Sequence, residues 1–188
     1  KRVSIGSWSF SLGPFADKPV PWTELLQRLK QLGYEGIEVA GFSIHPRPEN
    51  QPTKADRERI KQEAADIGIA FPSYIPDLWS ERIIDTDDSS GYLRAFRRGL
   101  EFAADIGATA LCIDTLARPN IFEEIDYETA VKRLANVWKR CAKEAADFGL
   151  YIGWEFEPVY AFNKPSEVVR IVEEVNEDNF GIVFDTCL

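Results

Sequence analysis

The chain has 188 residues, of which 45% are hydrophobic and 28% are charged, and it contains twelve Phe and five Trp. This composition is typical of a globular protein and excludes a disordered or low-complexity chain. The net charge of −9 argues against nucleic acid as the main partner, because phosphate binding requires clustered Lys and Arg, and no run of about 18 apolar residues is present to span a membrane.

The first predicted element is a strand around Val3–Phe10, and a repeated pattern follows it. In each repeat an amphipathic helical stretch closes with a glycine, and a short apolar run comes next. Three copies are nearly identical at Ala64–Gly68, Ala103–Gly107 and Ala145–Gly149, and a looser copy is Leu29–Gly33. A glycine at this point fits the left-handed position that ends a helix.

The apolar runs are predicted strands, at Ile37–Ala40, Ile69–Ile75, Ala110–Thr115, Tyr151–Phe156 and, last, Gly181–Asp185. Helical solenoids share a repeat of about 35–42 residues. Short runs rich in Ile, Val, aromatic residues and Cys instead suit buried strands. Strands that alternate with helices indicate a parallel sheet.

Two parallel architectures compete, an open doubly wound sheet and a barrel. The first strand leads into the segment Gly6–Gly13, which has the wrong glycine spacing for a dinucleotide-binding loop. Even unit lengths and polar strand ends favour a parallel (β/α) barrel of the TIM type.

Six strands and five helices use the whole chain, whereas an eight-fold barrel needs about 250 residues. We therefore expect a single α/β domain over residues 1–188 that is truncated after the sixth strand and lacks about two βα units. The first and last strands would then be open edges, which predicts that residues 1–188 alone either associate as a homo-oligomer or are poorly stable.

The strands predict which side chains face the helices and which face the barrel interior, because neighbours alternate along a strand. Large apolar residues of one parity should pack on the helices: Ile37, Val39, Leu111, Ile113, Ile152, Trp154, Phe156, Ile182 and Phe184. The acids of the other parity, together with the acids at the strand ends, then point inward: Glu38, Asp114, Glu155, Glu157 and Asp185.

These acids lie at or near the carboxyl ends of strands, where barrels of this type keep their active sites. Buried carboxylates repel one another, and a divalent cation removes that cost, so the pattern predicts a site for Mg, Mn or Ca. The alternative is that some acids, Glu38 and Asp114 above all, pair with Arg or cap a helix.

Three further side chains are candidates for substrate contact. His45, the single histidine, follows the second strand, and Trp8 lies near the end of the first. An aromatic ring such as Trp8 can stack on a sugar, although core packing explains it equally well. A solvated loop side chain is the simpler interpretation of His45, and we keep Asp114 as a third candidate.

The three cysteines, Cys112, Cys141 and Cys187, match no zinc spacing and cannot all pair in disulfides. We interpret them as reduced thiols of a cytoplasmic protein.

Three segments carry a family resemblance: Tyr151–Pro158, Phe162–Glu167 and Asn179–Cys187. They resemble the sugar phosphate isomerase/epimerase family of the xylose isomerase-like TIM barrel superfamily, and the similarity covers nearly the whole chain. This superfamily includes ketose 3-epimerases, inosose dehydratases and endonuclease IV. The resemblance implies an eight-stranded barrel that binds a divalent metal ion, often Mn, Mg, Co or Zn.

The resemblance also implies metal ligands: a Glu after strand five, an Asp after strand six, a His from strand seven and a Glu from strand eight. Counting from the helix-ending glycine selects Glu155, and aligning on Glu-Pro selects Glu157 as second choice. Asp185 matches the Asp of an Asp-Thr-x-His motif, but Leu188 stands where the family has His.

The resemblance therefore implies a metal-dependent isomerase or epimerase that acts through an enediolate on a small sugar, sugar phosphate or polyol-derived ketone, with Glu155 as a catalytic base. The second base would come from strand eight, so we expect residues 1–188 alone to be inactive. The alternatives are an inosose-type dehydratase and a sugar-binding barrel without turnover. An endonuclease is disfavoured by the acidic charge and the single histidine.

Overall fold

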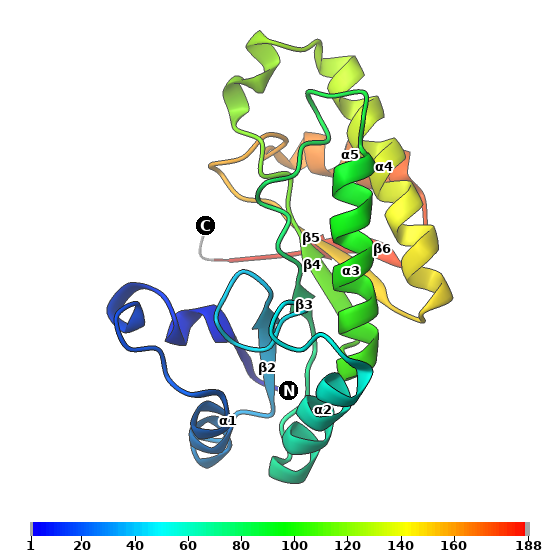
Figure 1. Cartoon of the computed structure of the whole chain (residues 1–188). Coiled ribbons are helices and arrows are strands. Elements are labelled where there is room, and N and C mark those ends of the chain that lie inside the picture. Colours follow the sequence, from blue (N-terminus) through cyan, green and yellow to red (C-terminus); the bar gives the residue numbers. More distant parts are fainter. Residues whose placement is uncertain (1, 187–188) are drawn as a thin grey trace. The chain divides into compact units, whose positions relative to one another are not determined.

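The computed structural model describes residues 2–186, and within them helices and strands alternate along the chain (Figure 1). The elements are β1 (Ser4–Gly6), α1 (Trp22–Gln31), β2 (Gly36–Ala40), α2 (Lys54–Ile67), β3 (Tyr74–Ile75), α3 (Ser90–Ile106), β4 (Ala110–Ile113), α4 (Tyr127–Asp147), β5 (Tyr151–Glu155), α5 (Pro165–Val175) and β6 (Phe180–Val183). Short 3-10 turns are η1 (Ser7–Phe10), η2 (Gly13–Phe15) and η3 (Pro119–Glu123).

The strands follow one another in the sheet in the order β1-β2-β3-β4-β5-β6. The pairs β1–β2, β2–β3, β3–β4 and β5–β6 are parallel, with registers such as Ile5 opposite Ile37 and Trp154 opposite Ile182. The predicted α/β fold with parallel strands in sequence order is therefore confirmed.

The chain divides into two compact units. Unit 1 comprises Lys1–Asp77 and Arg98–Leu111, and unit 2 comprises Leu78–Arg97 and Cys112–Leu188. A single domain over residues 1–188 stays a prediction.

Unit 1 is built on the alternation of β2. Ile37 and Val39 are fully buried, as the alternation predicts, and Glu38 between them is half-buried. The ring of Phe102 on α3 lies 5.0 Å from that of Tyr74 on β3. Burial of such large apolar side chains supplies most of the stabilisation of a core.

The repeated glycines end helices as predicted. The φ angles of Gly33, Gly68, Gly107 and Gly149 are 86°, 81°, 80° and 69°. In this left-handed region a side chain would be strained, so glycine is the residue that lets the chain turn from each helix into the next strand.

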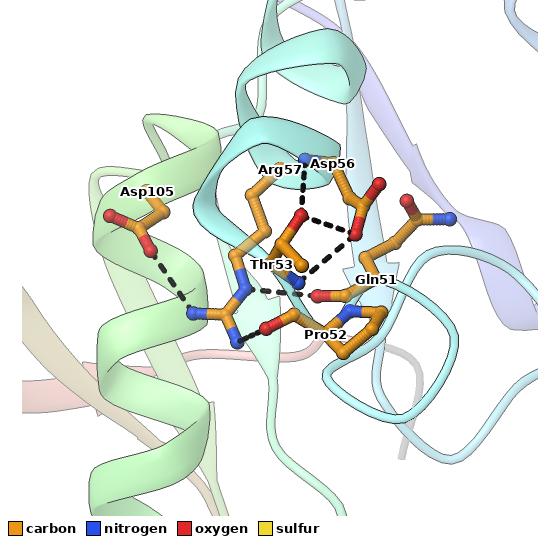
Figure 2. Close-up of polar contacts among 6 residues, drawn as sticks. All are labelled: Gln51, Pro52, Thr53, Asp56, Arg57 and Asp105. Atoms are coloured by element: carbon orange, nitrogen blue, oxygen red, sulfur yellow. Dashed lines mark hydrogen bonds and ion pairs between the residues drawn. The ribbon is translucent and has the colours of Figure 1, made fainter.

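The start of α2 is held by a polar network in unit 1 (Figure 2). Thr53 caps the helix by accepting from the Asp56 N–H at 3.1 Å, and the Asp56 carboxylate accepts from the Thr53 N–H in return. Arg57 then donates to the Gln51 carbonyl oxygen at 3.0 Å and to the Asp105 carboxylate at 3.0 Å. This network fastens the turn before α2 to α3.

Unit 2 packs α4 on β5, and Figure 1 shows α4 and α5 beside β5 and β6. The rings of Trp138 and Trp154 lie 5.1 Å apart, and both are buried. The Trp138 indole N–H donates to the Tyr92 hydroxyl at 3.1 Å, which satisfies a polar group inside the core. Trp154 thus faces the helices, as its parity predicts.

The last three strands are shorter than predicted by one or two residues, and β1 and β3 are much shorter. β1 ends at Gly6, and the next residues form η1, where the Ser7 hydroxyl accepts from the Ala40 N–H at 2.9 Å in place of a ladder bond. β3 is confined to Tyr74–Ile75 because Pro72 and Pro76 on either side cannot donate to a ladder.

The outer face of β6 departs from the predicted packing. Ile182 and Phe184 were expected to face helices, but they are 47% and 70% exposed.

Among the described residues, no helix is long and apolar enough to cross a membrane.

Candidate functional site

The centre of the candidate site in unit 2 is a contact between β4 and β5. The Cys112 thiol donates to Oε2 of Glu155, with 3.5 Å between sulfur and oxygen. The neighbouring residues Leu111 and Ile113 are buried on the other side of the strand. Because side chains alternate along β4, Cys112 points toward the acids. Cys112 and Asp114 are two positions apart and so face the same side, but the sequence analysis considered only Asp114.

Asp114 lies directly after β4 and carries the largest electrostatic perturbation of the site. Burial, followed by the charges of Glu157 and Glu155, raises its pKa to about 7, and the hydrogen bond from the Leu116 N–H opposes the rise. Its Oδ1 is buried and has no hydrogen-bond partner among the described residues. Near neutral pH this carboxyl can therefore hold or release a proton.

Glu157 belongs to the same acidic group. Burial raises its pKa, and the charges of Glu155 and Asp185 raise it further. Four of the predicted residues, Asp114, Glu155, Glu157 and Asp185, are thus linked by mutual repulsion within unit 2. Asp185 is exposed, whereas the other three are half-buried.

Tyr160 borders this group, although no periodicity of the sequence places it there. Burial raises its pKa most, Asp114 and Glu157 raise it further, and Arg118 opposes them. The hydroxyl of Tyr160 and the guanidinium of Arg118 are therefore available for hydrogen bonding next to the acids.

The segments after β4 and β5 are tied together. Ala161 N–H donates to the Ala117 carbonyl at 2.7 Å, and the Thr115 hydroxyl donates to the Ala161 carbonyl at 3.3 Å. Leu116 and Phe162 adopt left-handed φ angles of 52° and 62°, which cost about 1 kcal/mol or more each. Such strain persists only where the surroundings hold the chain firmly.

These residues fit a divalent cation in part. Carboxylate oxygens are the ligands of hard cations, and a bound cation would relieve the repulsion that raises the pKa of Glu157. Among residues 2–186, however, no group of three or more His, Cys, Asp or Glu side chains is arranged to hold a metal ion. Glu155, Asp185 and Glu157 stay predicted ligands, and Leu188 lies outside the described residues.

The other predicted residues belong to unit 1. Glu38 lies in the middle of β2 rather than at its end, and its carboxylate accepts a hydrogen bond from the Ser73 hydroxyl. Trp8 lies in η1 with 43% exposure, and its indole lies against Gly6, where a side chain would meet it.

His45 is only 3% exposed, and both ring nitrogens bond protein atoms. Nε2 donates to the Val20 carbonyl at 3.0 Å, so Nδ1 accepts from the Ser43 hydroxyl at 3.2 Å. Burial lowers the pKa of His45. The solvated side chain that we considered is thus replaced by a buried, hydrogen-bonded one, and its contact with substrate stays a prediction.

The cysteines that the structure describes, Cys112 and Cys141, are free and buried. Burial raises the pKa of the Cys141 thiol well above its usual range, so it is protonated and packs as a small apolar side chain. Cys187 lies outside the described residues.

Comparison with known proteins identifies a family and several similar structures. Residues 26–187 match the family described as Xylose isomerase-like TIM barrel. No curated protein matches the chain. A D-psicose 3-epimerase solved in the presence of D-fructose shares 18% identity with a TM-score of 0.72, over 97% of this chain and 62% of its own.

Two further structures are similar. The probable 3-DHS dehydratase AsbF of Bacillus anthracis is 16% identical with a TM-score of 0.73, covering 97% of this chain and 62% of its own. An IOLI protein with a bound zinc atom is 18% identical with a TM-score of 0.76, covering 99% and 63%. The chain thus spans about three fifths of the length of the structures that it matches.

Proposed function

Because the chain belongs to the xylose isomerase-like TIM barrel family, we propose that it forms part of a metal-dependent isomerase or epimerase. The substrate would be a small sugar, sugar phosphate or polyol-derived ketone. The observation that carries the proposal is the group of mutually repelling carboxylates at the ends of β4, β5 and β6 in unit 2. Such groups are costly without a function or a cation to offset them.

We assign the proton transfer to Glu155. Its carboxylate would remove a proton from the carbon beside the substrate carbonyl, leaving an enediolate. Returning this proton to the neighbouring carbon would isomerise the sugar, whereas epimerisation would require a second group that protonates the opposite face, which we expect from strand eight. The Cys112 thiol, 3.5 Å from Oε2, would hold the carboxylate in position for this step.

Glu155 and Asp185 are the proposed cation ligands, and Glu157 is the second choice to Glu155. A divalent ion, when bound, supplies a positive charge that polarises adjacent substrate oxygens. A zinc atom in the similar IOLI structure supports a divalent ion and leaves its identity open. Asp114, Glu38, His45 and Trp8 are the proposed substrate contacts.

Product analysis with the full-length protein tests this proposal. D-psicose, D-tagatose and L-ribulose are suitable probes, because similar structures are named for these ketoses or were solved with them. We expect Mn²⁺-dependent conversion of at least one ketose to its 3-epimer or to an aldose. No conversion of any ketose, with or without a divalent ion, would exclude the proposal.

A dehydratase is the second candidate, and the similarity to the probable 3-DHS dehydratase favours it. Proton removal by Glu155 followed by loss of water would give an unsaturated product that absorbs ultraviolet light. Sugar binding without either product would instead indicate a binding barrel without turnover.

A further inference from the structure

A cavity of about 340 Å³ lies in unit 2, apart from the acidic residues assigned above. Its two walls are Trp79–Asp85, which follows β3, and Thr115–Glu124, which follows β4 and includes η3. The volume is in the range of sites for small molecules.

The first wall is formed before any ligand binds. Leu78 and Ile84 are 3% and 1% exposed and anchor the segment in the core. The Glu81 N–H donates to the Leu78 carbonyl at 2.9 Å, a turn that carries Trp79 at its tip. Arg133 of α4 donates to the Ile84 carbonyl at 3.1 Å and fixes the far end of the wall.

The second wall is equally fixed. The Ile121 N–H donates to the Arg118 carbonyl at 3.0 Å, and the Glu124 N–H donates to the Ile121 carbonyl at 3.0 Å. Leu116, at the start of this wall, holds its left-handed conformation. A preformed cavity loses little conformational entropy when a ligand enters it.

The lining combines an aromatic surface with polar groups of both signs. Trp79 is 61% exposed, and the amide of Asn120 can both donate and accept. Arg82 pairs with Asp85 and is neutralised by it.

Three charged side chains of the lining then remain: Arg118, Glu81 and Glu124. Among the described residues, the Arg118 side chain forms no hydrogen bond or ion pair. One cation against two carboxylates makes the cavity unfavourable for a phosphate dianion and suitable for hydroxyl groups, which accept from the guanidinium and donate to the carboxylates.

Arg118 also connects the cavity to the acidic residues. Its charge acts on Tyr160, and Tyr160 in turn is affected by Asp114 and Glu157. The second wall of the cavity also begins at Thr115, directly after Asp114, so the cavity lies beside the acids and one ligand can extend from one to the other.

We propose that this cavity is a subsite for an uncharged, polyhydroxylated part of the substrate, with Trp79 as the stacking surface and Arg118 and Asn120 as hydrogen-bonding groups. It would select a neutral sugar over its phosphate ester. The inference rests on the proposed function for the reaction at the other end of the substrate, whereas sugar binding in the cavity does not depend on it.

Sugar binding without turnover tests the subsite. NMR titrations of the full-length protein with D-fructose and with D-fructose 6-phosphate, both with a chelator present, report binding in the absence of metal. We expect the phosphate ester to bind about tenfold more weakly than D-fructose. Trp79→Ala and Arg118→Ala should each weaken D-fructose binding about fivefold, and Trp79→Phe should keep most of it.

Arg140→Ala is the matched control, because Arg140 is an exposed arginine of α4 outside the cavity, and it should leave binding unchanged. Thermal melts check that each variant is folded, as expected for exposed positions. Tighter binding of the phosphate ester, or D-fructose binding that is absent or unaffected by Trp79→Ala and Arg118→Ala, would overturn the subsite. A failure of catalysis with these binding effects intact would count against the proposed function alone.

Discussion

The Cys112 thiol lies 3.5 Å from Oε2 of Glu155 and links β4 to the residue that we propose as the base. A donor in this place restrains the carboxylate and partly compensates its burial. Because the thiol touches Glu155 rather than a substrate, Cys112 is a positioning residue.

Replacing Cys112 with Ala should lower kcat about threefold to tenfold and leave KM nearly unchanged, since the lost hydrogen bond affects only the orientation of Glu155. Cys112→Ser keeps a donor and should recover most of kcat. Steady-state kinetics on the full-length protein make the comparison. An equal loss for Ala and Ser would indicate a packing role instead.

The pKa of Asp114, about 7 in the folded chain, predicts a pH-dependent stability. Because this carboxyl binds its proton more tightly when folded, the folded state binds more protons between pH 4 and 7, and its stability falls as pH rises through that window. Asp114→Asn cannot ionise and should raise the free energy of unfolding at pH 8 by about 1–2 kcal/mol, with little effect at pH 4. Urea unfolding at both pH values, with a chelator present, measures it, and a variant less stable at pH 8 than wild type would refute the prediction.

The Arg57–Asp105 pair should stabilise unit 1 (Figure 2). The two side chains are only 14% and 24% exposed, and the guanidinium also lies 5.5 Å from the centre of the Phe102 ring. Arg57→Ala leaves the Asp105 carboxylate and two carbonyls without this donor and should cost about 2–4 kcal/mol.

Arg59→Ala is the matched control for this pair. Arg59 pairs with Asp56 on the same helix, but it is 70% exposed, so its loss should cost less than about 1 kcal/mol. Chemical denaturation measures both variants. Equal losses would show that burial does not strengthen the Arg57 pair.

His45 can be followed by NMR without interference, because it is the single histidine of the chain. Burial should give it a pKa below 6.5 in the folded chain. The lowered pKa means that the unfolded state binds the proton more tightly, so stability is present above pH 6.5 and is lost as pH falls through the folded pKa. A ring that titrates at or above 6.5 would contradict the buried hydrogen-bonded network around it.

The sequence was sufficient for features that depend on local pattern. The Ala-Ala-Asp repeats located the ends of three helices, and strand alternation separated Trp154, against α4, from Glu155 on the other face. Both depend on backbone geometry that a few neighbouring residues fix.

Features that depend on distant contacts were not predictable. The left-handed conformations of Leu116 and Phe162 accompany hydrogen bonds between two loops. Neither residue is a glycine, so the sequence does not indicate these conformations. The burial of His45 likewise requires Val20, which is 25 positions away. β1 ends early and η1 replaces its predicted second half, where Ser7 accepts a hydrogen bond from Ala40 of a separate segment.

Proton exchange at the substrate carbon tests the central role of Glu155 most directly. The full-length protein is incubated with D-fructose in D₂O and Mn²⁺, and deuterium incorporation at C1 and C3 is followed by NMR for wild type, Glu155→Gln and the control Glu58→Gln, an exposed residue of α2. We predict incorporation in wild type and in the control, and a loss of about 10²-fold or more in Glu155→Gln. Incorporation that proceeds in Glu155→Gln at the rate of wild type would show that another group is the base.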